Sequence, residues 1–334
     1  MQTNEVYSWQ QEQWQYLVQR KNNNNLPHAL LMSGIDGLGK FNFAKLFARF
    51  VLCKNNNVNN LEYPCQSCSS CQLMEAMTHP DLLLIQKEDK EKTIKVDQIR
   101  ELITELYHTS QQGGAKVAII NIADSMNGAA SNALLKTLEE PAAGVYIILI
   151  TSKPSFLPAT IRSRCQNIIF KAPDVRVVKN WLANNHSSIF KDDSSLKVLL
   201  SLTNNSPFKI LEFLQEDKIK FRDELFANFC NVVLKQMHFT KFAELYLQED
   251  LSFVLLNFVT FVMDLVKVKQ KVAYGFLINE DKQLQIEELG KLFSLQGLFQ
   301  YLDKILEINK FISEGLNLNK QMLLERLVFD IFSN

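Results

Sequence analysis

Residues 29–40 read Ala-Leu-Leu-Met-Ser-Gly-Ile-Asp-Gly-Leu-Gly-Lys. The apolar run 29–32 predicts a buried strand, and apolar residues at three- and four-residue spacing after Lys40 predict an amphipathic helix. A glycine loop between a strand and a helix is the context of a phosphate-binding loop, because its backbone N–H groups can turn toward phosphate oxygens. We therefore name Gly34, Gly39 and Lys40 as candidate nucleotide-binding residues.

The residues that should support ATP hydrolysis at such a loop are replaced. A Ser or Thr normally follows the lysine and ligates Mg²⁺, whereas this chain has Phe41. An acidic pair should follow a later apolar strand, but Asn121 and Ile122 follow the strand predicted at 117–120. These three substitutions indicate a degenerate site that does not hydrolyse ATP, while the retained glycines and lysine leave nucleotide binding open.

Further apolar runs extend this beginning into a layered α/β domain. Helical patterns, such as that over 129–140, alternate with these runs, and this alternation predicts a parallel sheet covered by helices. After Pro173 the strand-like runs end, while helical periodicity continues. We therefore predict an α/β domain at 1–172, a small helical domain at 173–213 and a larger all-α domain at 214–334. Further strands are expected at 82–85, 117–120, 145–150 and 167–170.

The composition of the chain is that of a soluble globular protein of more than one domain. Its 334 residues carry 36 basic and 36 acidic side chains, with 47% hydrophobic and 22% charged residues. Zero net charge argues against a chain that grips a nucleic-acid backbone alone. The longest apolar stretch, 251–266, is interrupted by polar residues, and the first fifteen residues lack a signal-peptide pattern. We expect a cytoplasmic protein without a membrane segment.

Four of the six cysteines lie close together in the sequence. Cys65, Cys68 and Cys71 follow a Cys-x-x-Cys-x-x-Cys pattern, and Cys53 lies upstream. Two-residue spacers let thiolates converge on one ion, and four thiolates are the complement of a closed tetrahedral Zn²⁺ site. We therefore predict a structural zinc ion in an insert at about residues 53–71.

Alternatives to this ligand set stay open. Cys53 is the least determined ligand, because its spacing to the other three is loose, and His79 could take the fourth position instead. The cysteines could also be free thiols without a metal. One zinc per native chain would support a metal site, and a zinc content near zero would rule it out.

Several stretches together resemble one known family. They are His28-Ala-Leu-Leu31 before the loop, the cysteine run, the stretch 132–141 (Asn-Ala-Leu-Leu-Lys-Thr-Leu-Glu-Glu-Pro), and the stretch 157–165 (Leu-Pro-Ala-Thr-Ile-Arg-Ser-Arg-Cys). In these stretches the chain resembles the delta prime family of bacterial DNA polymerase III clamp-loader subunits. The resemblance covers residues 28–170 well, and the helical C-terminal half matches in character more than in sequence.

The resemblance implies an AAA+ module followed by a helical lid and a collar domain. In that family, five subunits form a ring that opens a sliding clamp and loads it onto primed DNA. The implied partners are the gamma or tau subunits and the delta subunit, with clamp and DNA contacted through the assembled complex. It also implies a chain that belongs to a DNA-directed DNA polymerase complex without an independent catalytic activity.

The resemblance assigns a role to Arg164, within Ser163-Arg164-Cys165. In the clamp-loader family the arginine of this motif reaches the ATP of a neighbouring subunit, where it stabilises charge that develops on the γ-phosphate. The alternative is a structural salt bridge. Two further positions resemble nucleotide sensors of AAA+ proteins: Thr151 after the fourth strand, and Lys209, which a surface charge explains as well.

Two other functions compete with the subunit role. The first is an ATP hydrolase in its own right, which the glycine loop favours and the substitutions at 41, 121 and 122 oppose. The second is a zinc-containing nucleic-acid-binding protein that acts alone. Zero net charge and the lack of interleaved basic and aromatic residues near the cysteines oppose it.

Overall fold

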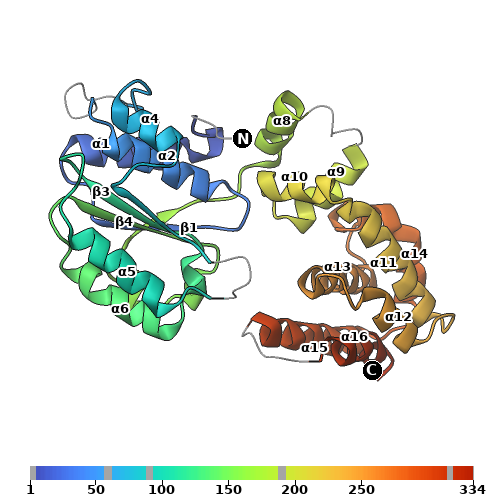
Figure 1. The fold of residues 1–334 in the computed structure, drawn as a ribbon. Helices are drawn as coiled ribbons and strands as arrows, with labels where there is room; N and C mark the ends of the chain where they lie inside the picture. Colours follow the sequence, from blue (N-terminus) through green and yellow to red (C-terminus); the bar gives the residue numbers. More distant parts are fainter. Residues whose placement is uncertain (1–4, 56–61, 88–92, 187–192, 314–318, 334) are drawn as a thin grey trace. The chain divides into compact units, whose positions relative to one another are not determined.

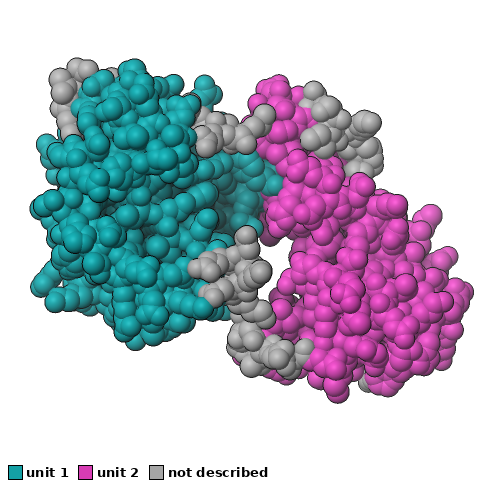
Figure 2. Space-filling view, in the orientation of Figure 1, with its two compact units in different colours: residues 1–178, 206–208 teal, residues 179–205, 209–334 magenta. Residues whose placement is uncertain are grey.

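The chain forms two compact units, which Figure 2 colours separately. The computed structural model describes residues 5–55, 62–87, 93–186, 193–313 and 319–333. Unit 1 comprises Met1–Val178 together with Ser206–Phe208, and unit 2 comprises Lys179–Asn205 and Lys209–Asn334. Each unit has its own hydrophobic core. The division into three domains at 172 and 213 is not tested by these units and stays a prediction.

Unit 1 is built on a five-stranded sheet in the order β2-β3-β4-β1-β5. All four strand pairs are parallel, so the carboxyl ends of the strands share one edge. The five predicted strands are confirmed; the last begins one residue earlier than expected and leaves Phe170 outside it. The strands are β1 (Ala29–Ser33), β2 (Leu82–Ile85), β3 (Lys116–Ile120), β4 (Val145–Thr151) and β5 (Gln166–Ile169).

Helices cover both faces of this sheet (Figure 1). Successive side chains of a strand point to opposite faces, so Leu30 and Met32 pack in one core cluster while Ala29 and Leu31 pack in the other. Because both faces are buried, the strands are nearly continuous apolar runs. One face carries α1 (Gln11–Asn22), α2 (Lys40–Leu52) and α4 (Ser69–Glu75), and the other carries α5 (Val96–Tyr107), α6 (Gly128–Glu139) and the short α7 (Ala159–Arg162).

The ends of α6 are set by local chemistry. The Asn127 side chain accepts a hydrogen bond from the backbone N–H of Ala130 at 2.8 Å, which satisfies a donor that the first turn leaves free. At the other end the helix stops at Glu139, two residues before Pro141. Short 3-10 helices lie at Ser8–Gln10, Ala123–Ser125 and Pro154–Phe156.

The described part of unit 2 is helical, as the sequence predicted beyond Pro173. α8 (Val175–Asn185) begins in unit 1 and continues in unit 2, and α10 (Pro207–Gln215) does the same. The other helices are α9 (Asp193–Leu202), α11 (Lys218–Val233), α12 (Phe239–Tyr246), α13 (Leu251–Lys269), α14 (Gln283–Gly290), α15 (Leu295–Ser313) and α16 (Lys320–Phe329). Short 3-10 helices lie at Tyr274–Phe276, Glu280–Lys282 and Asp330–Ser333.

Helix α13 is the central core helix of unit 2. By length and composition alone it could cross a membrane, but 61% of its most apolar window is buried inside the protein. Phe258 and Phe261 are fully buried, and the carboxylate of Asp264 accepts hydrogen bonds from the backbone N–H groups of Ile278 and Asn279 at 3.0 and 2.7 Å. A core position therefore explains the apolar character of this helix.

Candidate functional site

The glycine loop follows β1 at the carboxyl edge of the sheet. Gly37 and Gly39 adopt positive φ angles of 74° and 80°, which glycine tolerates without steric cost. A side chain at Gly34 would lie 2.3 Å from the carbonyl oxygen of Phe170. Each of these glycines is therefore required by the path of the backbone, and Gly39 leads directly into α2.

Lys40 is turned into the loop itself. Its Nζ donates hydrogen bonds to the carbonyl oxygens of Gly34 and Ile35 at 2.7 and 2.6 Å, and the residue is only 6% exposed. Burial lowers the pKa of this lysine from 10.5 to about 8, although the carboxylates of Asp36 and Asp124 act in the opposite direction. The ammonium group of Lys40, which would face a phosphate in a working loop, thus donates its hydrogen bonds to carbonyl oxygens of the chain itself.

Other hydrogen bonds to the loop come from segments that are distant in the sequence. The indole N–H of Trp9 and the side-chain amide of Gln10 donate to the carbonyl oxygen of Leu38 at 3.1 and 2.8 Å. The hydroxyl of Ser206 donates to the carbonyl oxygen of Asp36 at 2.6 Å. Sequence reasoning did not find these contacts, because no spacing or motif connects the segments.

An aromatic cluster lies against the end of the loop. The Phe208 ring meets those of Tyr7 and Trp9 edge-on, with centroids 5.2 and 6.4 Å apart, and the backbone N–H of Phe208 donates to the Gly37 carbonyl at 3.1 Å. A Cβ at Gly39 would lie 2.9 Å from the Phe208 ring. The apolar Phe208 thus contacts the loop directly. The neighbouring Lys209, named as a candidate second sensor, pairs with Glu212 at 2.6 Å.

The edge of the sheet beside the loop carries one acidic residue that the sequence did not single out. Asn121 and Ile122 follow β3, as the sequence has them, and Ile122 has a φ of 58°, a strained conformation for a β-branched residue. Two residues later, the carboxylate of Asp124 accepts a hydrogen bond from the Thr151 hydroxyl at 2.6 Å. Thr151, the candidate sensor, therefore binds Asp124.

The cysteine cluster brings its four predicted ligands together. The sulfur atoms of Cys53, Cys65, Cys68 and Cys71 all lie within 4.8 Å of one another, and those of Cys65 and Cys71 are 4.0 Å apart. Tetrahedral Zn–S bonds of about 2.3 Å imply sulfur–sulfur separations of about 3.8 Å, so the donor set fits this ion. Cys53 reaches the cluster because it directly follows α2, which ends at Leu52.

Hydrogen bonds already favour thiolates at part of this cluster. The backbone N–H groups of Cys68 and Cys71 donate to the sulfur atoms of Cys65 and Cys68, each at 3.4 Å. Burial opposes ionisation of Cys65, but hydrogen bonds from Cys68 and Ser67 prevail and lower its pKa to about 6. Burial raises the pKa of Cys71 to about 12, against a weaker lowering by the side chain of Arg49. A divalent cation would favour the thiolate form at all four positions.

His79 is engaged outside the cluster. Its Nε2 lies 2.7 Å from the hydroxyl of Ser70, and its Nδ1 accepts the backbone N–H of Asp81 at 3.1 Å. The Ser70 hydroxyl also donates to the Leu52 carbonyl at 2.6 Å. Both ring nitrogens of His79 are therefore engaged, and among the described residues the four cysteines form the group that could hold a metal ion.

Arg164 lies at the opposite edge of the sheet, two residues before β5. Its Nε donates to Oε1 of Glu139 at 2.6 Å, Nη2 pairs with the same oxygen, and Nη1 donates to the Thr160 carbonyl at 2.9 Å. The Arg164 side chain remains 33% exposed. The ion pair considered as an alternative from the sequence is present, and Glu139 is a partner that the sequence did not identify.

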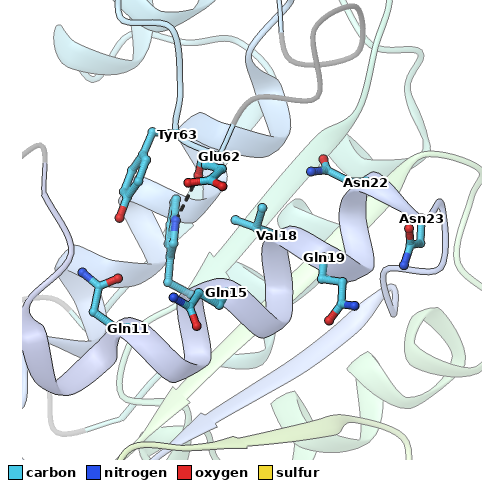
Figure 3. Close-up of a pocket in the computed structure, with 9 residues that line it drawn as sticks. Gln11, Gln15, Val18, Gln19, Asn22, Asn23, Glu62 and Tyr63 are labelled. Atoms are coloured by element: carbon cyan, nitrogen blue, oxygen red, sulfur yellow. Dashed lines mark hydrogen bonds between the residues drawn. The ribbon is translucent and has the colours of Figure 1, made fainter.

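The polar groove on α1 is separate from these candidate residues. A cavity of about 470 Å³ is lined by Gln11, Gln15 and Gln19, whose amides project along one face of the helix (Figure 3). Tyr63 stacks on Trp14 with ring centroids 5.3 Å apart, and the Trp14 N–H donates to the Glu62 carbonyl at 3.0 Å. None of the residues predicted from the sequence to bind nucleotide or metal lines this cavity.

The sheet order and the position of the glycine loop after β1 define the class of the protein. A parallel five-stranded sheet, a phosphate-type loop entering α2 and a helical C-terminal half are those of a P-loop AAA+ domain followed by an α-helical region. Among solved structures, the chain is similar to a DNA polymerase III gamma subunit-related protein from Thermotoga maritima. The two are 16% identical, the match covers 95% of this chain and 99% of that chain, and the TM-score is 0.44.

Comparisons of sequence identify the family. A family model described as DNA polymerase III, delta subunit, matches residues 9–174, and the model of its C-terminal part matches residues 216–331. DNA polymerase III subunit delta prime of Pseudomonas aeruginosa is 30% identical over 97% of this chain and 96% of its own length. The subunit of that name from Escherichia coli is 29% identical over 97% and 95% of the two chains. The chain therefore belongs to the DNA polymerase III delta prime family.

Proposed function

We propose that this chain is a non-hydrolysing subunit of a bacterial clamp loader and that Arg164 acts on ATP bound by a neighbouring subunit. The observation that carries this proposal is the placement of two groups. Lys40 begins α2 directly after the glycine loop at the carboxyl edge of the sheet, whereas Arg164 precedes β5 at the amino edge. The chain's phosphate-type loop and its partly exposed arginine therefore cannot belong to the same nucleotide site.

The strand register supports action in trans. Gln166, the first residue of β5, pairs with Leu30, which lies four residues before Gly34 of the loop. At about 3.3 Å per residue, the two edges are roughly 13 Å apart along the strands. Arg164 precedes Gln166 and is directed to Glu139, so its guanidinium group does not reach the loop of its own chain. A neighbouring subunit's γ-phosphate is the target that this placement favours, and such an arginine contributes about 10³–10⁵ in rate.

The loop supports at most nucleotide binding without hydrolysis. Gly34, Gly39 and Lys40 keep the backbone path of a phosphate-binding loop. Phe41 offers no hydroxyl for Mg²⁺, and its ring lies 4.7 Å from the ammonium group of Lys45. Any phosphate group would also have to compete with the carbonyl oxygens that Lys40 binds. We propose weak ATP binding and no turnover at this site.

Zinc has a structural role in this proposal. Cys53, Cys65, Cys68 and Cys71 would hold the ion through four thiolates, which leaves no position for a reactive water. When bound, the ion supplies cross-linking and charge neutralisation only. The cysteines connect the end of α2 to α4 and to the segment between them. The metal would therefore stabilise the insert, a role that a larger hydrophobic core would otherwise have.

The partners follow from the family. We propose that the chain assembles with the gamma or tau subunits and the delta subunit in the cytoplasm, and contacts the sliding clamp and primed DNA only through the complex. Residues 214–334 would form the collar that packs the subunits together, and residues 173–213 would form the lid after the AAA+ domain at 1–172. Removal of residues 214–334 should then abolish assembly.

Arg164→Ala in the assembled clamp loader tests the central claim. Hydrolysis at the neighbouring site that Arg164 serves should fall by about 10³-fold or more. The DNA-stimulated rate of the complex should therefore lose at least the share of that site, with assembly verified by size-exclusion chromatography. Arg162→Ala is the matched control, because Arg162 is an exposed arginine at the end of α7, two residues before Arg164. An unchanged rate for Arg164→Ala would make this arginine structural. Mg²⁺-dependent turnover by the purified chain that disappears in Lys40→Ala would favour the independent hydrolase instead.

A further inference from the structure

We propose that Glu139 is a positioning residue for Arg164, an inference that rests on the trans-acting role proposed above. Glu139 is the last residue of α6, and Arg164 follows α7 on the neighbouring segment. Glu139 contacts the edge of the guanidinium group that carries Nε and Nη2. Both Nε and Nη2 face the single carboxylate oxygen Oε1.

These contacts fix the guanidinium plane, while the Arg164 side chain stays 33% exposed. The group carries five N–H donors in a rigid plane. Nε and one Nη2 hydrogen are directed to Glu139, and Nη1 donates to the Thr160 carbonyl at 2.9 Å. A long contact of 3.5 Å joins Nη1 to the Ser163 hydroxyl. The second Nη2 hydrogen has no partner among these contacts, so Glu139 orients the group while this donor stays available to a phosphate oxygen.

The charge of Glu139 needs such a partner. A carboxylate at the C-terminus of a helix lies at the negative end of the helix dipole, where it is destabilised. Glu140, the next residue, adds a second negative charge. Glu139 is 48% exposed and Arg164 is 33% exposed, so the pair stabilises the fold only slightly and water can reach both groups. Orientation of Arg164 is the contribution that this geometry makes to function.

The test measures ATP hydrolysis by the reconstituted clamp loader with four versions of this chain. They are Glu139→Gln, Arg164→Ala, the double variant, and Glu140→Gln as the matched control. Because misplacement of a catalytic group by about 1 Å costs on the order of 10²-fold, Glu139→Gln should lower turnover at the site that Arg164 serves by about 10- to 100-fold. The kcat of the complex then loses most of the share of that site, while the KM for ATP stays within about twofold. Glu139→Asp, which restores the charge on a shorter side chain, should recover part of the loss.

The double variant separates positioning from a structural role. If Glu139 acts through Arg164, the double variant has the same rate as Arg164→Ala alone, because the second change removes nothing further. Suppose that Arg164→Ala lowers the rate. The positioning role is then overturned if Glu139→Gln has a normal or raised kcat, or if the losses of the two single variants add in the double variant; each of these results leaves the proposed function intact. An Arg164→Ala rate equal to wild type overturns both.

Discussion

The buried charge of Lys40 makes the stability of unit 1 depend on pH in a defined window. Burial lowers the pKa of Lys40 from 10.5 to about 8, a difference of 2.5. Each pKa unit corresponds to about 1.36 kcal/mol, so the protonated side chain costs about 3 kcal/mol in the folded state. A group with a depressed folded pKa binds fewer protons when folded, and stability then rises with pH between the two values.

The expected gain in the free energy of unfolding is large enough to measure. From pH 7 to pH 9.5, the folded state loses the Lys40 proton while the unfolded chain keeps most of it, which adds about 2 kcal/mol to the free energy of unfolding. Urea unfolding at several pH values gives this quantity. The tryptophans are Trp9, Trp14 and Trp181, so a Trp181→Phe background confines the fluorescence signal to unit 1.

Two substitutions isolate the contribution of Lys40 from that of other titrating groups. Lys40→Met is neutral and Lys40→Arg is cationic throughout this window, so neither titrates there. Both variants should lose the gain of about 2 kcal/mol relative to the parent, whatever their stability at pH 7. Parallel pH profiles for the parent and both variants would refute the view that Lys40 is held as a buried, destabilised cation.

Three further predictions concern the metal and the core of unit 2. Cys71→Ser should reduce zinc from about one per chain to near zero and lower the melting temperature. The control Cys230→Ser lies outside the cluster and should keep its zinc. Equal zinc content in both variants would contradict the four-cysteine site. Phe258→Ala should destabilise unit 2 by about 3–5 kcal/mol in thermal or urea unfolding, while the 71% exposed Phe276 should tolerate alanine with little change. Asp264→Ala should lower the free energy of unfolding of unit 2 by about 1–3 kcal/mol for each buried donor left without a partner. Hydrogen exchange at the backbone amides of Ile278 and Asn279 should then become faster. Unchanged exchange would argue that Asp264 does not hold these two amides.

The sheet could be predicted from the sequence because its strands are buried on both faces. Such strands appear as short apolar runs, and the glycine loop fixed the position of β1 relative to α2. The fifth strand was displaced by one residue because Phe170 is as apolar as its neighbours, and periodicity cannot place the end of so short a run. The angles between the helices and the partners of the loops depend on contacts distant in the sequence, which no local pattern contains.

The candidate site could be predicted in part for the same reason. The Cys-x-x-Cys-x-x-Cys spacing carries its own geometry, so the proximity of three of the cysteines followed directly, whereas Cys53 is placed only by the length and direction of α2. Tyr7, Trp9 and Phe208 reach the loop from segments up to about 200 residues apart, a distance over which the sequence gives no register. Asp124 also escaped notice, because it lies beyond the positions at which an acidic pair is expected.

The identity of the Arg164 partner illustrates what the sequence leaves undetermined. Glu139 and Glu140 are chemically equivalent and adjacent, and only the register of α6 decides which carboxylate faces Arg164. That register is fixed by Leu134 and Leu138, which are buried against the sheet on the same helix. The position of the arginine is therefore set by the core of unit 1 and not by the glycine loop at the other edge. Under the function proposed above, Arg164 would therefore be presented to a neighbouring ATPase in an orientation that the core of unit 1 determines, and not the glycine loop.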